Sequence, residues 1–269
     1  MRLILKKLIT KLAGSKNLQN NHTEDIWWEG NFSSWQDAIK VSAGYDYDDI
    51  IEKCQSSILK VRNNEAIYER DSFLLDHKEY SWALICGLLL ASAENKNTMN
   101  VIDFGGSLGS TYYQVKDLIG NIHRVNWNVV EQQKFVETGK REFQNEILRF
   151  YYTIQDCLNE NKCNIAILSS VMQYLEDPYE PLRQLIQSKI NYIIIDRTLF
   201  IDKDEPLITV QHVPESIYKA SYPCHLLIEK ELHLLIDNHY SIIADFDSGI
   251  DYCNYPGTYF KGFIMKRNA

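Results

Sequence analysis

The chain has 269 residues and a mass of 31.4 kDa, a length that predicts one or two domains. Its 36 acidic and 28 basic side chains give a formal net charge of −8. This charge disfavours a nucleic-acid backbone as the main partner, because phosphate binding requires a positive field. With 45% hydrophobic and 24% charged residues, the composition is that of a globular protein and excludes a disordered chain.

The cysteines and the apolar segments favour a cytoplasmic protein. The six cysteines form no C-x-x-C motif and do not lie at zinc-finger spacing with histidine, so we expect reduced thiols and no metal site. The longest apolar run covers residues 82–93, whereas a membrane-spanning helix needs about 20 residues. Residues 1–14 lack the features of a signal peptide. Their pattern favours an ordinary or frayed helix over a weak peripheral contact with a membrane.

The elements predicted before residue 98 are helices. A linker rich in Asn, Ser and Lys covers residues 15–23, and an aromatic cluster follows it. Ser33 or Ser34 can cap the first helix, because short polar side chains accept hydrogen bonds from the free N–H groups of a helix start. Helical spacing of apolar residues then predicts helices over 35–39, 46–59 and 71–93. We therefore predict a helical N-terminal cap over residues 1–98.

Strands alternate with helices from residue 100 onward. Short apolar runs predict five strands, over 100–104, 126–131, 148–154, 164–169 and 191–196. Helices are predicted between or after them, over 111–119, 135–146, 178–188 and 229–238. This alternation predicts a mostly parallel sheet covered by helices on both faces. Two last strands, over 241–247 and 258–266, have no helix between them and should pair antiparallel. The predicted fold class is α/β with a seven-stranded sheet, in a domain over residues 99–269.

A glycine-rich segment follows the first of these strands, at the edge of a parallel sheet where ligands bind. It reads Asp103-Phe-Gly-Gly-Ser-Leu-Gly109, and a helix is predicted directly after it. Glu131 ends the second strand, and an acid about 20 residues beyond such a loop typically accepts hydrogen bonds from ribose hydroxyls. The pattern indicates a nucleoside-binding site. The alternative is an α/β protein without a nucleotide that uses glycine only to turn the chain.

The loop favours S-adenosylmethionine over NAD. In a dinucleotide loop the middle glycine gives room for the pyrophosphate, and that position holds Ser107 here. Asp103 would repel a pyrophosphate but could receive a ligand ammonium. S-adenosylmethionine carries an ammonium group and a ribose and has no phosphate.

On these residues the chain resembles class I S-adenosylmethionine-dependent methyltransferases, which have a Rossmann-like fold. More narrowly, it resembles a family of bacterial methyltransferases from about Trp27 onward. The segments that carry the resemblance are WEGNFSSWQDA, YERD, VIDFGGSLG, NVVE, SSVMQYLEDP, IIIDRT, TVQHVP and SYP. Genes of this family often occur among surface-polysaccharide genes, which implies a small or glycan-linked acceptor.

The resemblance implies a set of cofactor contacts. Asp103 would face the ammonium group of the cofactor, Glu131 would hold the ribose hydroxyls, and Ser169 would lie beside the cofactor at the end of the fourth strand. Three glycines would line its methionine part: Gly105, Gly106 and Gly109. The residue that frames the adenine would lie within 151–156, where the usual "GD" or "DA" dipeptide is absent.

Methyl transfer requires an aligned acceptor and, for a hydroxyl or amine, removal of its proton. His212 suits a general base because imidazole titrates near neutrality, and Asp196 is the second catalytic candidate. The other candidates are Ser170, Gln173, Tyr174, Arg197 and Tyr222. Structural roles are the alternatives: a bonded or surface histidine at 212 and a local ion pair at 196–197. Arg70 could bind the cofactor carboxylate or form a salt bridge at a helix end.

These features predict an enzyme that transfers a methyl group from S-adenosylmethionine to oxygen or nitrogen of a small or glycan-linked acceptor. The alternatives are a catalytically silent cofactor-binding module of the same fold and an NAD-dependent oxidoreductase.

Overall fold

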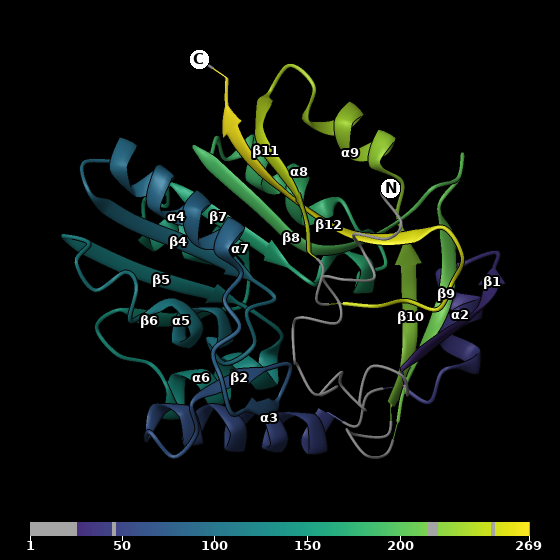
Figure 1. Ribbon diagram of the computed structural model, residues 1–269, viewed down its shortest axis with the longest axis horizontal. Coiled ribbons are helices and arrows are strands. Elements are labelled where there is room, and N and C mark those ends of the chain that lie inside the picture. The colour runs from purple at the N-terminus through teal and green to yellow at the C-terminus, as the bar shows by residue number, and fades with distance from the viewer. Residues whose placement is uncertain (1–25, 45–46, 215–219, 249–250, 269) are drawn as a thin grey trace, which may run out of the picture.

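The computed structural model describes residues 26–44, 47–214, 220–248 and 251–268, and a seven-stranded sheet forms its centre (Figure 1). The strand order is β11-β12-β8-β7-β4-β5-β6. The pairs among β4 to β8 are parallel, whereas β12 runs antiparallel to β8 and to β11. The predicted α/β sheet with an antiparallel final hairpin is confirmed, and its order is that of the Rossmann-like methyltransferase fold. The strands are β4 (Thr98–Phe104), β5 (Arg124–Val130), β6 (Leu148–Tyr151), β7 (Ile165–Ser169), β8 (Tyr192–Ile201), β11 (Tyr240–Asp247) and β12 (Thr258–Arg267).

Helices cover both faces of this sheet. Successive residues of a strand point to opposite faces, so one strand contributes side chains to two apolar cores. Val101 of β4 packs in one apolar core and its neighbour Ile102 in the other. The first core also holds side chains of α3 (Tyr47–Arg62), α4 (Trp82–Glu94), α5 (Ser110–Val115) and α6 (Gln133–Glu142). The second holds side chains of α7 (Ile154–Glu160), α8 (Glu180–Gln187) and α9 (Glu229–Ile236).

Two of the predicted N-terminal helices are confirmed. The first is α2 (Trp35–Val41), and Ser34 caps it by accepting a hydrogen bond from the amide of Asp37 at 3.1 Å. The second is α3, which extends the predicted 46–59 segment to Arg62. The predicted linker and the residues before it lie outside the described residues.

The third predicted helix, over 71–93, is wrong in its first half. Residues 68–75 form a small hairpin of β2 (Tyr68–Arg70) and β3 (Phe73–Leu75), and α4 begins only at Trp82. The two turn residues have left-handed backbones, with φ of 50° at Asp71 and 69° at Ser72. A helix cannot continue through two such residues. Aspartate and serine, which suggested a helix cap, form a turn here instead.

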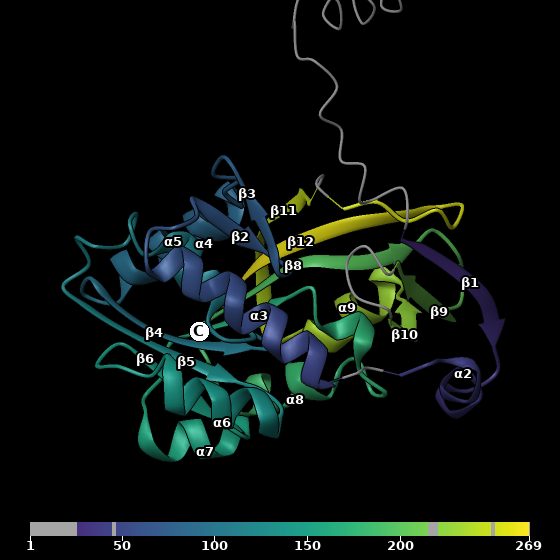
Figure 2. The ribbon, with the colours of Figure 1, turned by 90° about the horizontal axis from the view of Figure 1, so that it is seen from below.

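A second sheet follows the predicted fifth strand, in a region for which the sequence predicts no strand. β8 continues to Ile201, and β9 (Leu207–Val213) and β10 (Ala220–Leu226) follow it. β9 pairs on its other side with β1 (Trp27–Phe32), which gives the order β1-β9-β10 (Figure 2). The inner face of this sheet packs on Leu199 and Ile201 of β8. β1 thus shows that the region before residue 98 is not only helical, and the division at residue 98 stays a prediction.

Gly139 gives a test of the packing between α6 and the sheet. A Cβ atom at this position would lie 2.4 Å from Cδ1 of Phe150, a ring that is 1% exposed. Alanine favours a helix over glycine by about 1 kcal/mol, but overpacking a filled core costs about 1–3 kcal/mol. We expect Gly139→Ala to lower the free energy of unfolding by about 1 kcal/mol or more, measured by urea denaturation. Gly120→Ala is the control, because its Cβ would meet only a backbone oxygen at 3.9 Å. A Gly139→Ala protein as stable as the wild type would contradict this description of the core.

Candidate active site

A cavity opens at the carboxyl ends of β4 and β7 and beside the middle of β8, at the edge where the sequence predicts a ligand site. Its wall is formed by Cys54 of α3, by residues 68–72 and by residues 79–81 and 84, which lie around the β2–β3 hairpin and the start of α4. The glycine loop and α5 contribute residues 103, 105–107, 110, 111, 114 and 115, and the end of β7 and the middle of β8 complete the wall. Among the predicted site residues, the cavity brings together Asp103, Gly105, Gly106, Ser169 and Asp196. Ser170, Arg70 and Arg197 line it as well.

The glycine loop lies tightly against its own strand. Gly105 has a φ of 73°, its amide donates to the carbonyl of Val130 at 2.9 Å, and a Cβ here would lie 2.5 Å from the side chain of Val171. A Cβ on Gly106 would lie 2.5 Å from the carboxyl carbon of Asp103. Both positions therefore require glycine, since a side chain would clash with Val171 or with the carboxyl group below.

Asp103 is a buried carboxylate in the wall of the cavity, with a relative exposure of 1%. Its Oδ2 accepts a hydrogen bond from Nε1 of Trp127 at 2.9 Å. Burial raises the pKa of Asp103 to about 6, and the Trp127 hydrogen bond opposes this rise. Among the described residues no lysine, arginine or histidine forms an ion pair with it. A ligand cation would therefore meet a negative charge that the protein leaves unneutralised.

Glu69 is a second buried carboxylate of the cavity, with a relative exposure of 5%. It accepts hydrogen bonds from the hydroxyl of Ser110 and from the amide of Ser72, the latter at 2.7 Å. Burial raises the pKa of Glu69 to about 7. Glu69 is not among the predicted site residues, although it lies in the YERD segment. Its neighbours in the sequence are Tyr68 and Arg70, and this polar position beside a predicted helix start does not indicate a buried carboxylate.

The other predicted cofactor residues lie beside the cavity rather than in its wall. Glu131 directly follows β5, is half-buried, and accepts a hydrogen bond from the amide of Gln132 at 2.6 Å. Gly109 is the N-cap residue of α5, with a φ of 92°, and a Cβ there would meet Leu148 at 2.9 Å. The segment expected to frame adenine, 151–156, holds the end of β6 and the start of α7. The cofactor roles of these residues stay predictions.

Asp196 and His212, the two predicted catalytic residues, have different surroundings: Asp196 lines the cavity and His212 does not. Asp196 is buried and accepts hydrogen bonds from the hydroxyls of Ser81 at 2.9 Å and Ser248 at 3.0 Å. His212 lies on β9, where its Nε2 is 2.8 Å from a carboxylate oxygen of Glu29 and its ring stacks on Trp27.

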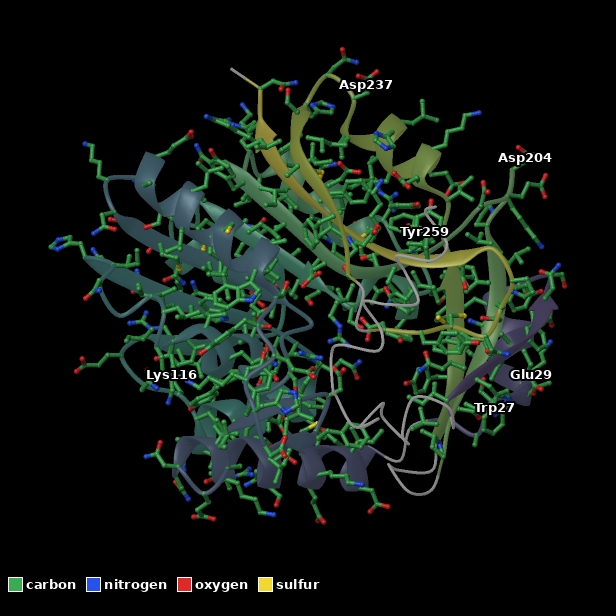
Figure 3. All side chains as sticks on the ribbon, viewed as in Figure 1. Trp27, Glu29, Lys116, Asp204, Asp237 and Tyr259 are labelled. Atoms are coloured by element: carbon green, nitrogen blue, oxygen red, sulfur yellow. The ribbon has the colours of Figure 1, made fainter. Side chains whose placement is uncertain are left out.

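Figure 3 shows Trp27 and Glu29 at the outer edge of the second sheet, on the opposite side of the molecule from Lys116 at the end of α5. His212 is not among the residues of the cavity wall. Its catalytic role stays a prediction.

Gln173 is buried, and its amide group donates to the carbonyl of Arg197 at 3.2 Å. Tyr174 packs edge-to-face on Tyr222 with ring centroids 5.4 Å apart.

Strained backbone is concentrated in this cavity. Ten described residues other than glycine have positive φ angles, and five of them belong to the cavity wall: Asp71, Ser72, Ser107, Ser170 and Arg197. Each such residue costs roughly 1–3 kcal/mol and persists only where its surroundings hold it, which is typical of ligand sites.

A bulge in β8 directs Arg197 toward the cavity. Ile195 pairs with Phe263 and Thr198 with Lys261, so Asp196 and Arg197 together oppose one residue, Gly262, on β12. The guanidinium group of Arg197 reaches Asp251 through Nε at 2.7 Å and Asp71 through Nη2 at 2.6 Å. Bulges near active sites commonly redirect a side chain in this way.

Arg70 is also paired in the cavity wall, because its Nη1 lies 2.6 Å from Oε2 of Glu79. A salt bridge is the predicted alternative to a cofactor contact for Arg70, although this one lies at a hairpin and not at a helix end.

In the described part of the chain, no group of three or more His, Cys, Asp or Glu side chains could hold a metal ion. None of the described helices is both long enough and apolar enough to span a bilayer.

No family model matches the chain, and no curated protein matches it in sequence. Among solved structures it is similar to an S-adenosylmethionine-dependent methyltransferase from Clostridium acetobutylicum ATCC 824, with a TM-score of 0.43, 12% identity, and coverage of 68% of this chain and 90% of that one. It is also similar to magnesium protoporphyrin IX methyltransferase from Synechocystis PCC 6803, with a TM-score of 0.44, 12% identity, and coverage of 88% and 92%.

Human N-acetylserotonin methyltransferase gives a TM-score of 0.44 at 13% identity, with coverage of 68% of this chain. The chain spans about half of that protein's length, 51%. At TM-scores below 0.5 these similarities identify neither the reaction nor the substrate of this chain.

The buried carboxyl of Asp103 predicts a pH dependence of stability. Its pKa rises from 3.8 to about 6 on folding, so between these values the folded protein holds a proton that the unfolded chain has released. Stability should therefore fall as the pH rises through this window. We expect Asp103→Asn to remove this part of the pH dependence, about 2 kcal/mol between pH 4 and 7, relative to the wild type. Urea denaturation at each pH measures it, and parallel curves for the two proteins would show that Asp103 titrates normally.

Proposed function

We propose that this chain binds S-adenosylmethionine in the cavity and transfers its methyl group to a small or glycan-linked acceptor. The observation that supports this most directly is the carboxyl of Asp103, buried under the glycine loop without a cation partner in the described part of the chain. An ammonium group satisfies such a carboxylate, and a phosphate group does not. The same residue therefore argues against NAD.

The residues present fit this cofactor as follows. Asp103 would hold the ammonium group, and Glu131 would hold the ribose hydroxyls from the end of the neighbouring strand. Gly105 and Gly106 would let the backbone approach the methionine part, with Ser169 opposite them at the end of β7. When bound, the cofactor supplies an electrophilic methyl group, so the protein has to align the acceptor and accept its proton.

The cavity wall is rich in groups that suit a polar acceptor. Six serines line it: Ser72, Ser81, Ser107, Ser110, Ser169 and Ser170. Glu69 and Asp196 add two carboxylates that can accept a proton from a hydroxyl or an amine. These groups support a small hydroxylated or amino-bearing acceptor. The described cysteines are all free thiols, which supports the proposal of a reducing, cytoplasmic location.

Cofactor binding is tested with two ligands that differ in one part. S-adenosylhomocysteine carries the amino-acid ammonium, whereas 5′-methylthioadenosine keeps the adenosine and lacks it. We expect Asp103→Asn to weaken binding of the first by about 1.5–3 kcal/mol and to leave the second nearly unchanged, by titration calorimetry. Asp204→Asn, an exposed aspartate at the far side of the molecule, is the matched control (Figure 3). No binding of S-adenosylhomocysteine to the wild type, or a thermal shift with NAD instead, would refute the proposal.

The ribose contact gives the complementary result. Because both ligands contain the ribose, Glu131→Ala should weaken both by a similar amount, on the order of 1.5–3 kcal/mol. Equal dissociation constants for the folded variant and the wild type would exclude Glu131 from the site.

The proton acceptor can be assigned once tritium transfer from labelled cofactor has identified an acceptor. Loss of a general base slows turnover by about 10²–10⁴-fold. This loss should occur in Asp196→Asn if Asp196 takes the proton, and in His212→Gln if His212 does. Cofactor binding without transfer to any acceptor would favour a catalytically silent binding module.

A further inference from the structure

The β2–β3 hairpin is the part of the cavity wall that is least anchored to the rest of the fold. Its two strands have three residues each and, among the described residues, pair only with each other. A two-stranded hairpin is marginally stable by itself. The remaining walls belong to α4, α5 and the central strands, whose side chains form the first apolar core. Of the parts of the cavity wall, the hairpin should therefore require the least free energy to move.

The inner side of the hairpin is held by hydrogen bonds to two elements. Glu69 accepts from the hydroxyl of Ser110, and its carbonyl accepts from Nε2 of Gln114 at 2.8 Å. Ser57 of α3 donates to the carbonyl of Ser72 at 2.7 Å. These contacts connect the hairpin to α5 and α3, which lie beside it (Figure 2).

The tip of the hairpin is held across the cavity by one ion pair. Both carboxylate oxygens of Asp71 accept from Arg197, at 2.6 Å from Nη2 and 3.2 Å from Nη1. The two side chains differ in exposure, 53% for Asp71 and 13% for Arg197. Arg197 is fixed in place by the β8 bulge and by Asp251, whereas Asp71 lies on the strained turn. The pair therefore joins a rigid wall to a movable one.

Arg197 does not depend on Asp71 for charge compensation. Asp251 binds it in bidentate fashion, through Nε at 2.7 Å and Nη2 at 2.8 Å. Two carboxylates thus share one guanidinium group, and release of Asp71 leaves Arg197 neutralised by Asp251. Opening at this point does not expose an unpaired buried charge, which would otherwise oppose it strongly.

We propose that the β2–β3 hairpin is a lid over the cavity and that Asp71 is its latch on Arg197. The lid opens by exchanging the Asp71–Arg197 pair for water while Arg197 stays bound to Asp251. If the proposed function holds, the ligand that passes under the lid is S-adenosylmethionine or its product. Five consecutive residues of the lid, 68–72, line the cavity, so a ligand that fills the cavity is covered by them.

The variant that tests the latch is Asp71→Asn. Asparagine tolerates the left-handed backbone at this turn, so the change removes the charge of the latch without adding strain. Asp76→Asn is the matched control. It removes one negative charge from the segment just after β3, and among the described residues Asp76 forms an ion pair only with exposed His77.

Two measurements test the proposal on the full chain. Amide hydrogen exchange of residues 68–75 without ligand should be faster by on the order of tenfold in Asp71→Asn, and within about twofold of wild type in Asp76→Asn. Dissociation of S-adenosylhomocysteine, followed by stopped flow, should be faster by a similar factor in Asp71→Asn only.

The outcomes separate the lid from the proposed function. Unchanged exchange in Asp71→Asn overturns the latch, whether or not the ligand binds. Faster exchange with unchanged dissociation shows a hairpin that moves without controlling the cavity, which overturns the lid. If the wild type binds no S-adenosylhomocysteine, the proposed cofactor is wrong, and the exchange data alone then decide whether Asp71 holds the hairpin.

Discussion

The carboxyl group of Asp103 imposes the constraint around which the site is arranged. It lies near the end of β4, an inner strand of the large sheet, between the indole of Trp127 and the backbone of Gly106. A side chain at Gly106 would occupy the space of this carboxyl, so the loop can lie flat on the strand only with glycine there. The indole supplies one hydrogen bond, which is too little to neutralise a buried charge. The fold thus keeps a carboxylate that is costly in the free protein, which is expected where a cationic ligand later stabilises it.

A second constraint is the strain around the same cavity. Arg197 has a φ of 50° in the middle of a strand, and Asp71 has the same value in a turn that lacks glycine. In both cases polar contacts hold the unfavourable backbone: the amide of Arg197 donates to Asp196 and Ser248, and the amide of Ser72 donates to Glu69. The strain is therefore offset locally, and removal of these contacts should relax the cavity before it affects the apolar cores.

The sequence predicted the parts of the fold that depend on local patterns. The seven strands of the large sheet were found because buried strands appear as short apolar runs, and Asp103 and the glycines were found because the loop follows such a run. The second sheet is not predicted because its strands are not apolar runs. β10 is fully buried although it contains Ser221, Pro223 and His225, and β1 is mostly exposed. In the segment Leu207–Val213, for instance, apolar and polar residues alternate only weakly. The predicted helix over 71–93 failed because Asp71 and Ser72 are equally common at helix starts and in turns.

Glu69 and the Asp71–Arg197 pair could not have been found from local patterns, because they depend on contacts between distant parts of the chain. Arg197 meets Asp71 across 126 residues, and Ser81 meets Asp196 across 115. Such contacts close only after both the sheet and the N-terminal region are in place, since each long loop must be ordered before its contacts stabilise it. We therefore expect the cavity wall formed by the hairpin to gain its stabilising contacts late in folding and to lose them early in unfolding. A ligand-binding wall is commonly drawn from this least stable part of a fold, because it has to open without unfolding the rest.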